Sequence, residues 1–448
     1  MRLRFEDPLK TDVEDFSSRE LFAHFPTPRA RVFRMSRPPL MSLEQALEIV
    51  ISQAHEAPMK AEEVSCFEAD GRVLLTDLIA PLEVPARDNS AMDGYAIKVA
   101  DSIVPNATLQ VTQRIPAGTT GQTLLAGQAA RIFTGAWIPD GADAVVMQED
   151  CLLDGEQLQL QKPVLKGQWI RKQGEDVKLG QTVLKAGERL NPASLGLAAS
   201  IGQDRLWVAK KPRVALFSTG DELVMPGEVE PKDMKPGSIY NSNRFFLRSL
   251  LIRLGCEVTD MGIVPDDQES TMDALSFAAQ GHDLILTSGG VSVGEEDHVK
   301  PSVQALGALN LWSLSMKPGK PFALGHINAA GQSSLKTHFM GLPGNPVSSF
   351  VTFLVLVRPF LLALQCASHL LPKIQTLPAH FELPKADARR EFLRVKKNDQ
   401  GGLDLFKNQS SGVLTSCVWA DGLLDNPSQQ TIKYGQMVSY LSFSELLT

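Results

Sequence analysis

Cysteine is scarce in this sequence, and its few members stand far apart. Five occur in 448 residues, namely Cys66, Cys151, Cys256, Cys366 and Cys417, and none belongs to a C-x-x-C pair. A disulfide framework usually has an even number of cysteines, and a zinc cluster needs closely spaced ones. Neither is indicated, so the composition favours a reducing compartment, the cytoplasm.

Long hydrophobic runs are also lacking. The N-terminus shows no apolar segment of the kind that precedes a secretory cleavage site, so secretion is not expected. The most apolar stretch, residues 350–367, is interrupted by Arg358 and Pro359 and falls short of a clean membrane span. We predict a buried helix that is broken near its middle, and no association with a membrane.

An excess of positive charge is missing as well. The net charge of −7 and the pI near 5.7 argue against a broad nucleic-acid surface, because binding to phosphates needs a basic face. A few local lysines can still hold one small polyanion. The hydrophobic content of 43% is typical of a soluble globular protein, and the length of 448 residues predicts two to four domains.

A glycine loop between a strand and a helix organises the chain. The apolar run 283–287 is typical of a buried parallel strand, and it leads into residues 288–297, which hold three glycines and end in three carboxylates. Acids at a helix start can simply cap the helix. Together with the lysines of residues 317–321, they favour a phosphorylated ligand held by amides and lysines, with a divalent cation on the carboxylates.

Strands and helices alternate after Arg213. Apolar runs at 214–217, 257–263, 283–287 and 311–316 are separated by helical patterns at 242–254, 269–279 and after residue 297. This series predicts an α/β domain, residues 209–370, with a doubly wound, mostly parallel sheet and helices on both faces. Ligands bind at the carboxyl ends of such strands, so the loops that follow the strands are predicted to share one rim.

The candidate site residues are the polar side chains and glycines of these loops. They are Ser218, Thr219, Gly220, Glu222, Asp266, Ser288, Gly289, Gly290, Gly294, Asp297, Lys317 and Lys320. A fifth loop adds Pro343, Gly344, Asn345 and Ser348, and its Asn-Pro pair predicts a helix start whose amides face an anion. The set favours a nucleotide-like ligand with Mg²⁺, and capping of each helix is the competing interpretation.

The first half of the chain predicts three further units. Residues 1–36 form an extension without steady periodicity. A capping box at Ser42 and a second helix start near residue 191 place a mixed linking domain at residues 37–80 and 179–208. Between them, short period-two patterns at 109–112, 128–133, 144–147 and 157–160 predict the strands of an inserted β-rich domain, residues 81–178.

Polar loops of the inserted domain are also candidates. The block 84–96 places Asp88 and Asp93 five residues apart, which a plain turn does not require, and a site and a turn are equally compatible with it. Thr134 and Asp176 lie in two other polar loops. The loop at 171–176 sets cations beside acids, which is more often a solvated surface than a site.

Past residue 372 the pattern returns to strands and predicts a C-terminal β-domain, residues 371–448. It contains Arg394, whose guanidinium can pair with an oxyanion. An arginine in a strand is more often a solvated residue at the rim of a sheet.

These motifs resemble one known family closely. The chain is similar to the MoeA-type molybdopterin molybdenumtransferases and to the E domains of gephyrin and its plant counterpart. The resemblance covers the chain from about residue 40 to its end. It rests on residues 88–96, 131–136, 174–176, 218–223, 288–297, 317–321 and 341–348.

The resemblance implies a fold and a reaction. It implies an α/β multidomain protomer with a MogA-like α/β domain and a C-terminal β-barrel-like domain, and a homodimer in which Asp93, Thr134 and Asp176 of one subunit face the rim of the other. Adenylylated molybdopterin and molybdate would give Mo-molybdopterin and AMP. Contacts with the molybdopterin adenylyltransferase and with molybdoenzyme maturation factors are compatible with it.

The rim residues fit that chemistry in outline. Glu222, Asp266 and Asp297 would hold Mg²⁺ on the pyrophosphate. The oxyanion would be held by Lys317, Lys320, Arg394 and Ser348. Serine at 313 departs from a basic residue that the family usually carries, and Asn241 from an aspartate that it often has.

Two other functions are compatible with parts of the sequence. Residues 212–365 also resemble the single domain of the molybdopterin adenylyltransferases, but that function does not require the loops at Asp93 and Thr134. A non-catalytic scaffold, as gephyrin provides, would leave the rim as a remnant.

Overall fold

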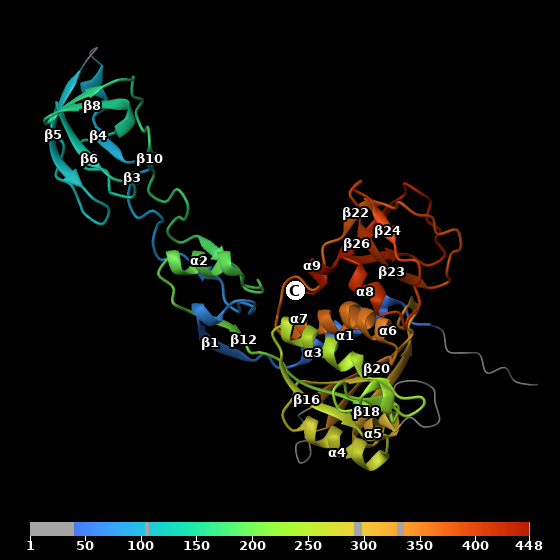
Figure 1. The fold of residues 1–448 in the computed structure, drawn as a ribbon. Helices are drawn as coiled ribbons and strands as arrows, with labels where there is room; N and C mark the ends of the chain where they lie inside the picture. Colours follow the sequence, from blue (N-terminus) through green and yellow to red (C-terminus); the bar gives the residue numbers. More distant parts are fainter. Residues whose placement is uncertain (1–39, 104–106, 291–297, 329–335, 448) are drawn as a thin grey trace, which may run out of the picture. The chain divides into compact units, whose positions relative to one another are not determined.

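The structure, a computed structural model, describes residues 40–103, 107–290, 298–328 and 336–447 (Figure 1). The predicted extension at residues 1–36 and the candidates Gly294 and Asp297 lie outside the described residues. The described residues form one compact unit by their contacts.

The first helix, α1 (Leu43–Glu56), begins at the predicted capping box. The Ser42 hydroxyl accepts from the amide of Gln45, and the Gln45 side chain accepts from the amide of Ser42, both at 3.2 Å. Two amides at the helix start are thereby satisfied. The apolar stripe of α1 is buried and packs against α7 (Arg358–Leu364).

A small mixed region follows α1 and returns after the inserted domain. Strand β1 (Ala61–Ser65) pairs antiparallel with β12 (Arg205–Ala209), and β2 (Leu78–Ile79) pairs with β11 (Thr182–Leu184). Helix α2 (Pro192–Ser200) begins at Asn191, whose side chain accepts from two backbone amides. Paired strands therefore come from both sides of residues 81–178.

The inserted β-rich region is built on one six-stranded sheet. Its order is β7-β4-β6-β5-β9-β8. The strands are β4 (Gly94–Ile97), β5 (Thr108–Ile115), β6 (Gln128–Ile132), β7 (Ala144–Met147), β8 (Cys151–Asp154) and β9 (Gln157–Leu160). Strands were predicted at four of these places and missed at β4 and β8. All four residues of β4 are buried, so it shows no alternation, while β8 is a mostly exposed edge strand.

Five short elements lie in this region or just before it. Strand β3 (Asn89–Ser90) pairs with β10 (Ile170–Arg171), and the 3₁₀ turns are η1 (Cys66–Glu68), η2 (Val99–Ser102) and η3 (Gln148–Asp150). The pairing of β3 with β10 joins the polar blocks 84–96 and 171–176.

The α/β domain has a six-stranded sheet in the order β16-β13-β17-β21-β20-β18. Its strands are β13 (Arg213–Thr219), β16 (Glu257–Val264), β17 (Leu284–Ser288), β18 (Gly307–Ser313), β20 (Pro321–Asn328) and β21 (Lys336–Leu342). The first four strands in that order are parallel neighbours, and β20 runs antiparallel to both of its neighbours. The prediction of a doubly wound, mostly parallel sheet is confirmed.

Helices cover both faces of this sheet. They are α3 (Ser242–Arg253), α4 (Gln268–Ala279), α5 (Val299–Leu306) and α6 (Pro346–Thr352). Alternate residues of β13 enter different cores: Val214 and Leu216 share one with α3, and Ala215 and Phe217 share the other with α4 and α5. This alternation is the period of two that a strand buried on both faces requires.

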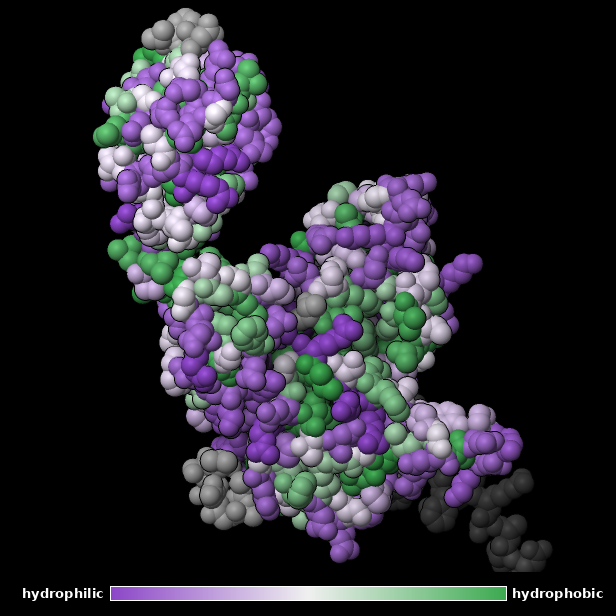
Figure 2. Space-filling view, turned by 60° about the vertical axis from the view of Figure 1, so that its left-hand side comes forward, coloured by the Kyte–Doolittle hydropathy of each residue, from purple (hydrophilic) through white to green (hydrophobic). Residues whose placement is uncertain are grey.

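The long apolar segment forms a helix with an irregular middle. Helix α6 passes through the π-helical turn η5 (Phe353–Val357) into α7. Residues Pro346–Leu364 are long and apolar enough to cross a membrane by length and composition alone, but 94% of the segment is buried inside the protein. On the face that Figure 2 shows, hydrophilic and hydrophobic residues are interspersed.

The C-terminal region forms another sheet, in the order β19-β23-β25-β26-β22, with β24 paired to β23. Its elements are β19 (Met316–Lys317), β22 (Gln375–Pro378), β23 (Arg390–Lys397), β24 (Leu403–Leu405), α8 (Thr415–Trp419), β25 (Gly422–Asn426), β26 (Met437–Ser442) and α9 (Phe443–Leu446). Strand β19 comes from the α/β domain, between β18 and β20. The predicted strand at 311–316 is therefore divided: β18 ends at Ser313, and Met316 joins the other sheet.

Candidate active site

A pocket of about 760 Å³ opens where the loops after β13, β16, β17 and β21 meet. Its lining includes Thr219, Gly220, Glu222, Asp266, Ser288, Gly289, Gly290, Pro343, Gly344 and Asn345, all of them predicted site residues. The lining also contains Leu223, Ile239, Tyr240, Asn241, Ser242, Asn243, Pro321, Pro346 and Gly412. The parallel sheet thus brings four of the five predicted loops to one cavity, as the rule for carboxyl strand ends anticipates.

Close backbone packing shapes the loops after β13 and β17. Gly220 has φ +140°, and a Cβ at this position would lie 2.6 Å from Oε2 of Glu222. Gly289 has φ +97°, and its Cβ would lie 2.8 Å from the carbonyl oxygen of Thr219. Only glycine fits these two positions without displacing its neighbours. The Glu222 carboxylate therefore lies directly over the glycine turn.

Asn243 ties two of the loops together and was not predicted. Its side-chain amide donates to the Ser288 hydroxyl and to the Gly344 carbonyl oxygen, both at 2.7 Å. The residue is buried, at 7% exposure, in the first turn of α3. A polar residue with a low helix preference so close to the helix start was the one available signal.

Asn241 caps α3 and also lines the pocket. Its Oδ1 accepts from the amide of Arg244. Its Nδ2 is buried and has no hydrogen-bond partner among the described residues, and the residue lines the pocket. Two-stranded pairing of β14 (Leu223–Val224) with β15 (Ile239–Tyr240) holds the chain before this cap, and η4 (Pro231–Asp233) lies between them.

Two carboxylates of the pocket fit a magnesium ion. Mg²⁺ is usually bound through one or two carboxylates, with waters and substrate phosphates as the other ligands. Glu222 and Asp266 supply such oxygens from two loops of one cavity. The described residues contain no group of three or more His, Cys, Asp or Glu side chains arranged to hold a metal by themselves. Asp297, the third predicted ligand, lies outside the described residues.

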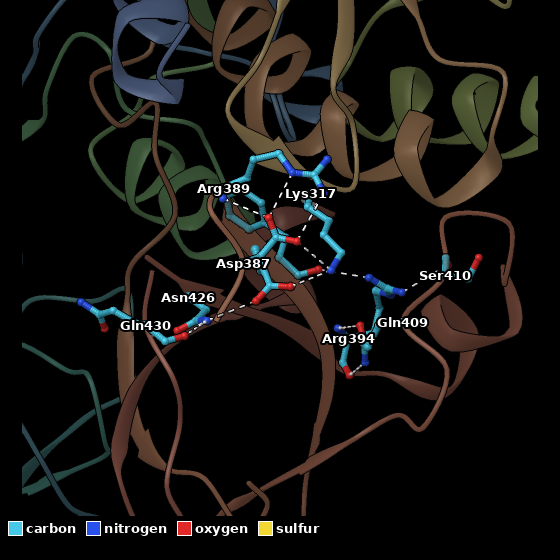
Figure 3. A network of polar contacts seen from close by, with 10 residues as sticks. Lys317, Asp387, Arg389, Arg394, Gln409, Ser410, Asn426 and Gln430 are labelled. Carbon is cyan, nitrogen blue, oxygen red and sulfur yellow. Dashed lines mark hydrogen bonds and ion pairs between the residues drawn. The ribbon is translucent and has the colours of Figure 1, made fainter. Parts of the chain in front are cut away.

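The predicted oxyanion ligands do not line this pocket. Lys320 is exposed, and Ser348 is buried at 5% exposure. Ser218, another predicted site residue, is buried at 1% exposure and does not line the pocket either. Lys317 reaches the C-terminal sheet, where its ammonium donates to Asp387 at 3.1 Å and to Glu391 at 3.0 Å (Figure 3). Partial burial opposes charge on Lys317, but hydrogen bonds to the two carboxylates outweigh it and raise its pKa.

Arg394 is buried at 1% exposure, which differs from both interpretations of its sequence position. Its guanidinium donates to the Ser416 hydroxyl and to the carbonyl oxygens of Phe392 and Ser410 (Figure 3). These bonds fix the loop that carries Gly412 into the lining of the pocket. The residue contacts this loop, and the structure does not bring it to the pocket surface.

The loop at residues 409–412 also contacts the start of α6. The amide of Val347 donates to the carbonyl oxygen of Ser411 at 2.9 Å, and Asn345 makes no side-chain cap. The predicted set of amides facing an anion is therefore smaller than the Asn-Pro pair suggests.

Two candidates of the inserted region, Asp93 and Thr134, contact each other directly. One oxygen of Asp93 accepts from the amide of Thr134 at 2.8 Å and from its hydroxyl at 2.7 Å. These hydrogen bonds lower the pKa of the Asp93 carboxyl, so it stays ionised. Asp93 and Thr134 are both exposed. The structure thus pairs two residues that the sequence separates by 41 positions.

The loop at 171–176 is held to the block 84–96 by hydrogen bonds. Asp88 accepts from the Lys172 ammonium at 2.7 Å and from the amide of Gln173 at 2.9 Å. The amide of Asp176 donates to the carbonyl oxygen of Val84, and the Asp176 side chain is exposed. Asp88 is therefore a brace between the loops.

Comparisons with known proteins place the chain in a family. Its residues 41–202 match the MoeA N-terminal region (domain I and II), residues 215–363 a probable molybdopterin binding domain, and residues 376–443 the MoeA C-terminal region (domain IV). A molybdopterin molybdenumtransferase of Haemophilus influenzae is 38% identical over 427 residues, which are 91% of this chain and 100% of that protein. One of Synechococcus elongatus is 35% identical over 85% of this chain and 93% of its own.

Solved structures agree with these matches. A molybdopterin biosynthesis MoeA protein from Pyrococcus horikoshii is 31% identical, with a TM-score of 0.71 over 90% of this chain and 99% of that one. A second structure of that name is 27% identical, with a TM-score of 0.76 over 90% and 100%. The chain therefore belongs to the MoeA family of molybdopterin molybdenumtransferases. The family resemblance and the enzyme class predicted from the sequence are confirmed.

Proposed function

We propose that this enzyme transfers molybdate onto adenylylated molybdopterin, giving Mo-molybdopterin and AMP in a reaction that requires Mg²⁺. One observation carries the proposal: glycine turns and two carboxylates from separate loops line a single pocket at the carboxyl rim of the parallel sheet. Backbone amides next to glycines suit phosphate oxygens, and carboxylates suit a cation that neutralises them. The names of the relatives, molybdopterin molybdenumtransferases, support the reaction class.

Within this proposal the pocket binds the nucleotide end of the substrate. The glycine loops after β13 and β17 approach the pyrophosphate, and the loop Pro343–Asn345 closes the cavity beside them. Glu222, Asp266 and Asp297 would hold Mg²⁺, which when bound neutralises the charge that develops as AMP leaves. Asn243 keeps two of these loops at a fixed separation.

The molybdate side of the site involves the lysines. Lys317 and Lys320 supply positive charge for the oxyanion, Ser348 a hydroxyl, and Arg394 supports the loop at residues 409–412 from beneath. Attraction and positioning both favour insertion of the metal oxyanion into the dithiolate.

The proposed active unit is a homodimer in the cytoplasm. Asp93, Thr134 and Asp176 of one subunit would complete the rim site of the other. The hydrogen bonds that fix the Asp93 carboxylate as an ionised acceptor support a role beyond a plain turn. Adenylylated substrate reaches the enzyme from an adenylyltransferase, and molybdoenzyme maturation factors would take the product.

The test is molybdate-dependent release of AMP from adenylylated molybdopterin by the purified protein. We expect Glu222→Gln and Asp266→Asn each to lower the rate by roughly 100-fold or more, because each removes a charge that acts on the leaving group. Asp221→Asn is the matched control, since Asp221 is the exposed neighbour of Glu222 and does not line the pocket. Equal rates for all three variants and the wild type would refute the assignment of these carboxylates.

A further inference from the structure

Lys317 lies in a segment between two strands of the α/β domain that pairs with the C-terminal sheet. It belongs to the two-residue strand β19, which pairs in parallel with β23 of the C-terminal sheet. Lys317 stands directly opposite Glu391 in that pairing. A residue assigned from the sequence to a loop of the α/β domain is therefore held by the C-terminal domain.

The Lys317 ammonium rests on two carboxylates. It lies 3.0 Å from Oε1 of Glu391 and 3.1 Å from Oδ2 of Asp387 (Figure 3). The Glu391 side chain is only 5% exposed, that of Asp387 21%, and that of Lys317 41%. The carboxylates thus form the buried side of the contact, and the lysine forms the exposed side.

Each carboxylate is itself fixed by its own domain. The second oxygen of Glu391 accepts from the side chain of Asn426 at 3.4 Å. Oδ1 of Asp387 accepts from the amide and from Nε of Arg389, at 3.0 and 3.1 Å. The acceptors for the ammonium therefore have fixed positions, which a flexible lysine on a surface does not normally find.

The charges of the cluster balance, and one N–H donor of Lys317 is not used by the two carboxylates. Lys317 and Arg389 balance Asp387 and Glu391, so the cluster is neutral by itself. An ammonium has three N–H donors, and these two carboxylates accept two of them. The third donor has no carboxylate partner in this pair, and the Lys317 side chain is 41% exposed, so a ligand can reach it from the solvent side.

We propose that Asp387 and Glu391 are positioning residues that orient the Lys317 ammonium toward the oxyanion substrate. The inference rests on the proposed function, in which Lys317 binds molybdate. It makes the C-terminal domain a contributor to catalysis, because that domain fixes the direction of a cation that the α/β domain carries.

A double-mutant cycle between Glu391 and Lys317 tests this. Glu391→Gln keeps the shape and removes the charge, and we expect kcat for AMP release to fall roughly tenfold while KM for adenylylated molybdopterin changes less than twofold. Lys317→Met alone should cost more. In the Lys317→Met background, Glu391→Gln should cause no further loss, because its effect passes through the lysine. Asp387→Asn should behave in the same way.

A matched control separates positioning from folding. Asp425 is a carboxylate of similar burial, 8% exposed, which pairs with Arg390 and has no contact with Lys317. Asp425→Asn should lower the melting temperature about as much as Glu391→Gln and leave kcat within twofold of the wild type. The inference is overturned if the losses of Glu391→Gln and Lys317→Met multiply, or if Asp425→Asn lowers kcat as much as Glu391→Gln does.

A failure of the proposed function would be recognised separately. In that case the wild-type chain releases no AMP, and the same variants are compared for molybdate binding by calorimetry. Loss of the Glu391→Gln effect in the Lys317→Met background would support the positioning role there. Independent effects of the two substitutions on binding would overturn it.

Discussion

The Glu222 carboxylate lies where a side chain on Gly220 would otherwise be. Gly220 has φ +140°, and its missing Cβ leaves the space that the carboxylate occupies. We expect Gly220→Ala to destabilise the fold by about 1 kcal/mol or more and to displace Glu222. AMP release should then fall along with the affinity for Mg²⁺, measured by titrating the metal in the assay. A variant with unchanged metal dependence would contradict this placement.

His338 makes the stability depend on pH below neutrality. Burial, and then the charge of His326, lower the pKa of His338 from its ordinary value of 6.5. The unfolded chain takes up this proton near pH 6.5 and the folded chain only at lower pH, so stability is lost as the pH falls through that interval. The ring packs edge-on against Phe360 at 5.0 Å, so His338→Phe is a reasonable replacement.

The measurement is the melting temperature of both proteins between pH 7.5 and pH 5. The wild type should lose more stability over this range than His338→Phe, and the two curves should run parallel above pH 7. Parallel curves at all values would show that His338 does not contribute.

The sequence identified the site residues whose positions follow from the local pattern of strands and loops. It did not identify a residue whose role depends on contacts distant in the sequence. Thr219 and Ser288 end strands, and Gly220 and Gly289 follow them. The carboxyl ends of neighbouring parallel strands lie at one edge of the sheet, so pattern and topology located these residues. Asn243 was missed because its role is set by two hydrogen bonds to loops 45 and 101 residues away. No periodicity in a sequence reports such contacts.

Among the elements, helix α2 offers the simplest test of local physics. Gly196 lies exposed inside it, and a Cβ there would meet no atom within 4 Å. Gly196→Ala should therefore stabilise the protein by about 0.5–1 kcal/mol, because alanine loses less backbone entropy on folding.

Asn191→Ala should lower the free energy of unfolding by about 1 kcal/mol, since Oδ1 of Asn191 accepts from two amides of the first turn. Urea denaturation checks both.

Helices whose starts are marked by capping residues were predicted from the sequence. A strand that forms only because a distant strand pairs with it was not. The capping box of α1 and the Asn-Pro start of α2 sit where their residues indicated. Strand β19 has two residues and exists because β23 pairs with it, so its sequence alone carries no strand pattern. The same long-range pairing shortened the strand predicted at 311–316.

The whole molecule is proposed to act as a dimer with shared sites. If Asp93 of one subunit and Asp266 of the other serve the same substrate, then Asp93→Asn and Asp266→Asn subunits are inactive alone. Mixed dimers of the two should recover activity, because one of the two sites then contains no substitution. Subunits with different tags allow the mixed dimer to be purified and assayed.

The control is a mixed dimer in which both substitutions lie on one chain and the other chain is wild type. It should be nearly inactive, because each shared site then contains one substituted residue, whereas sites confined to single chains would leave about half of the wild-type activity. Activity confined to the wild-type homodimer, or a monomeric protein at assay concentrations, would contradict the shared site.

The most direct measurement counts AMP and molybdenum together. Purified protein is given adenylylated molybdopterin, Mg²⁺ and molybdate, and the AMP released is compared with the molybdenum carried by the pterin product. We expect a ratio near one, no AMP without molybdate, and loss of both products in Asp266→Asn. AMP formed without molybdenum transfer, or adenylylation of molybdopterin from ATP in its place, would contradict it.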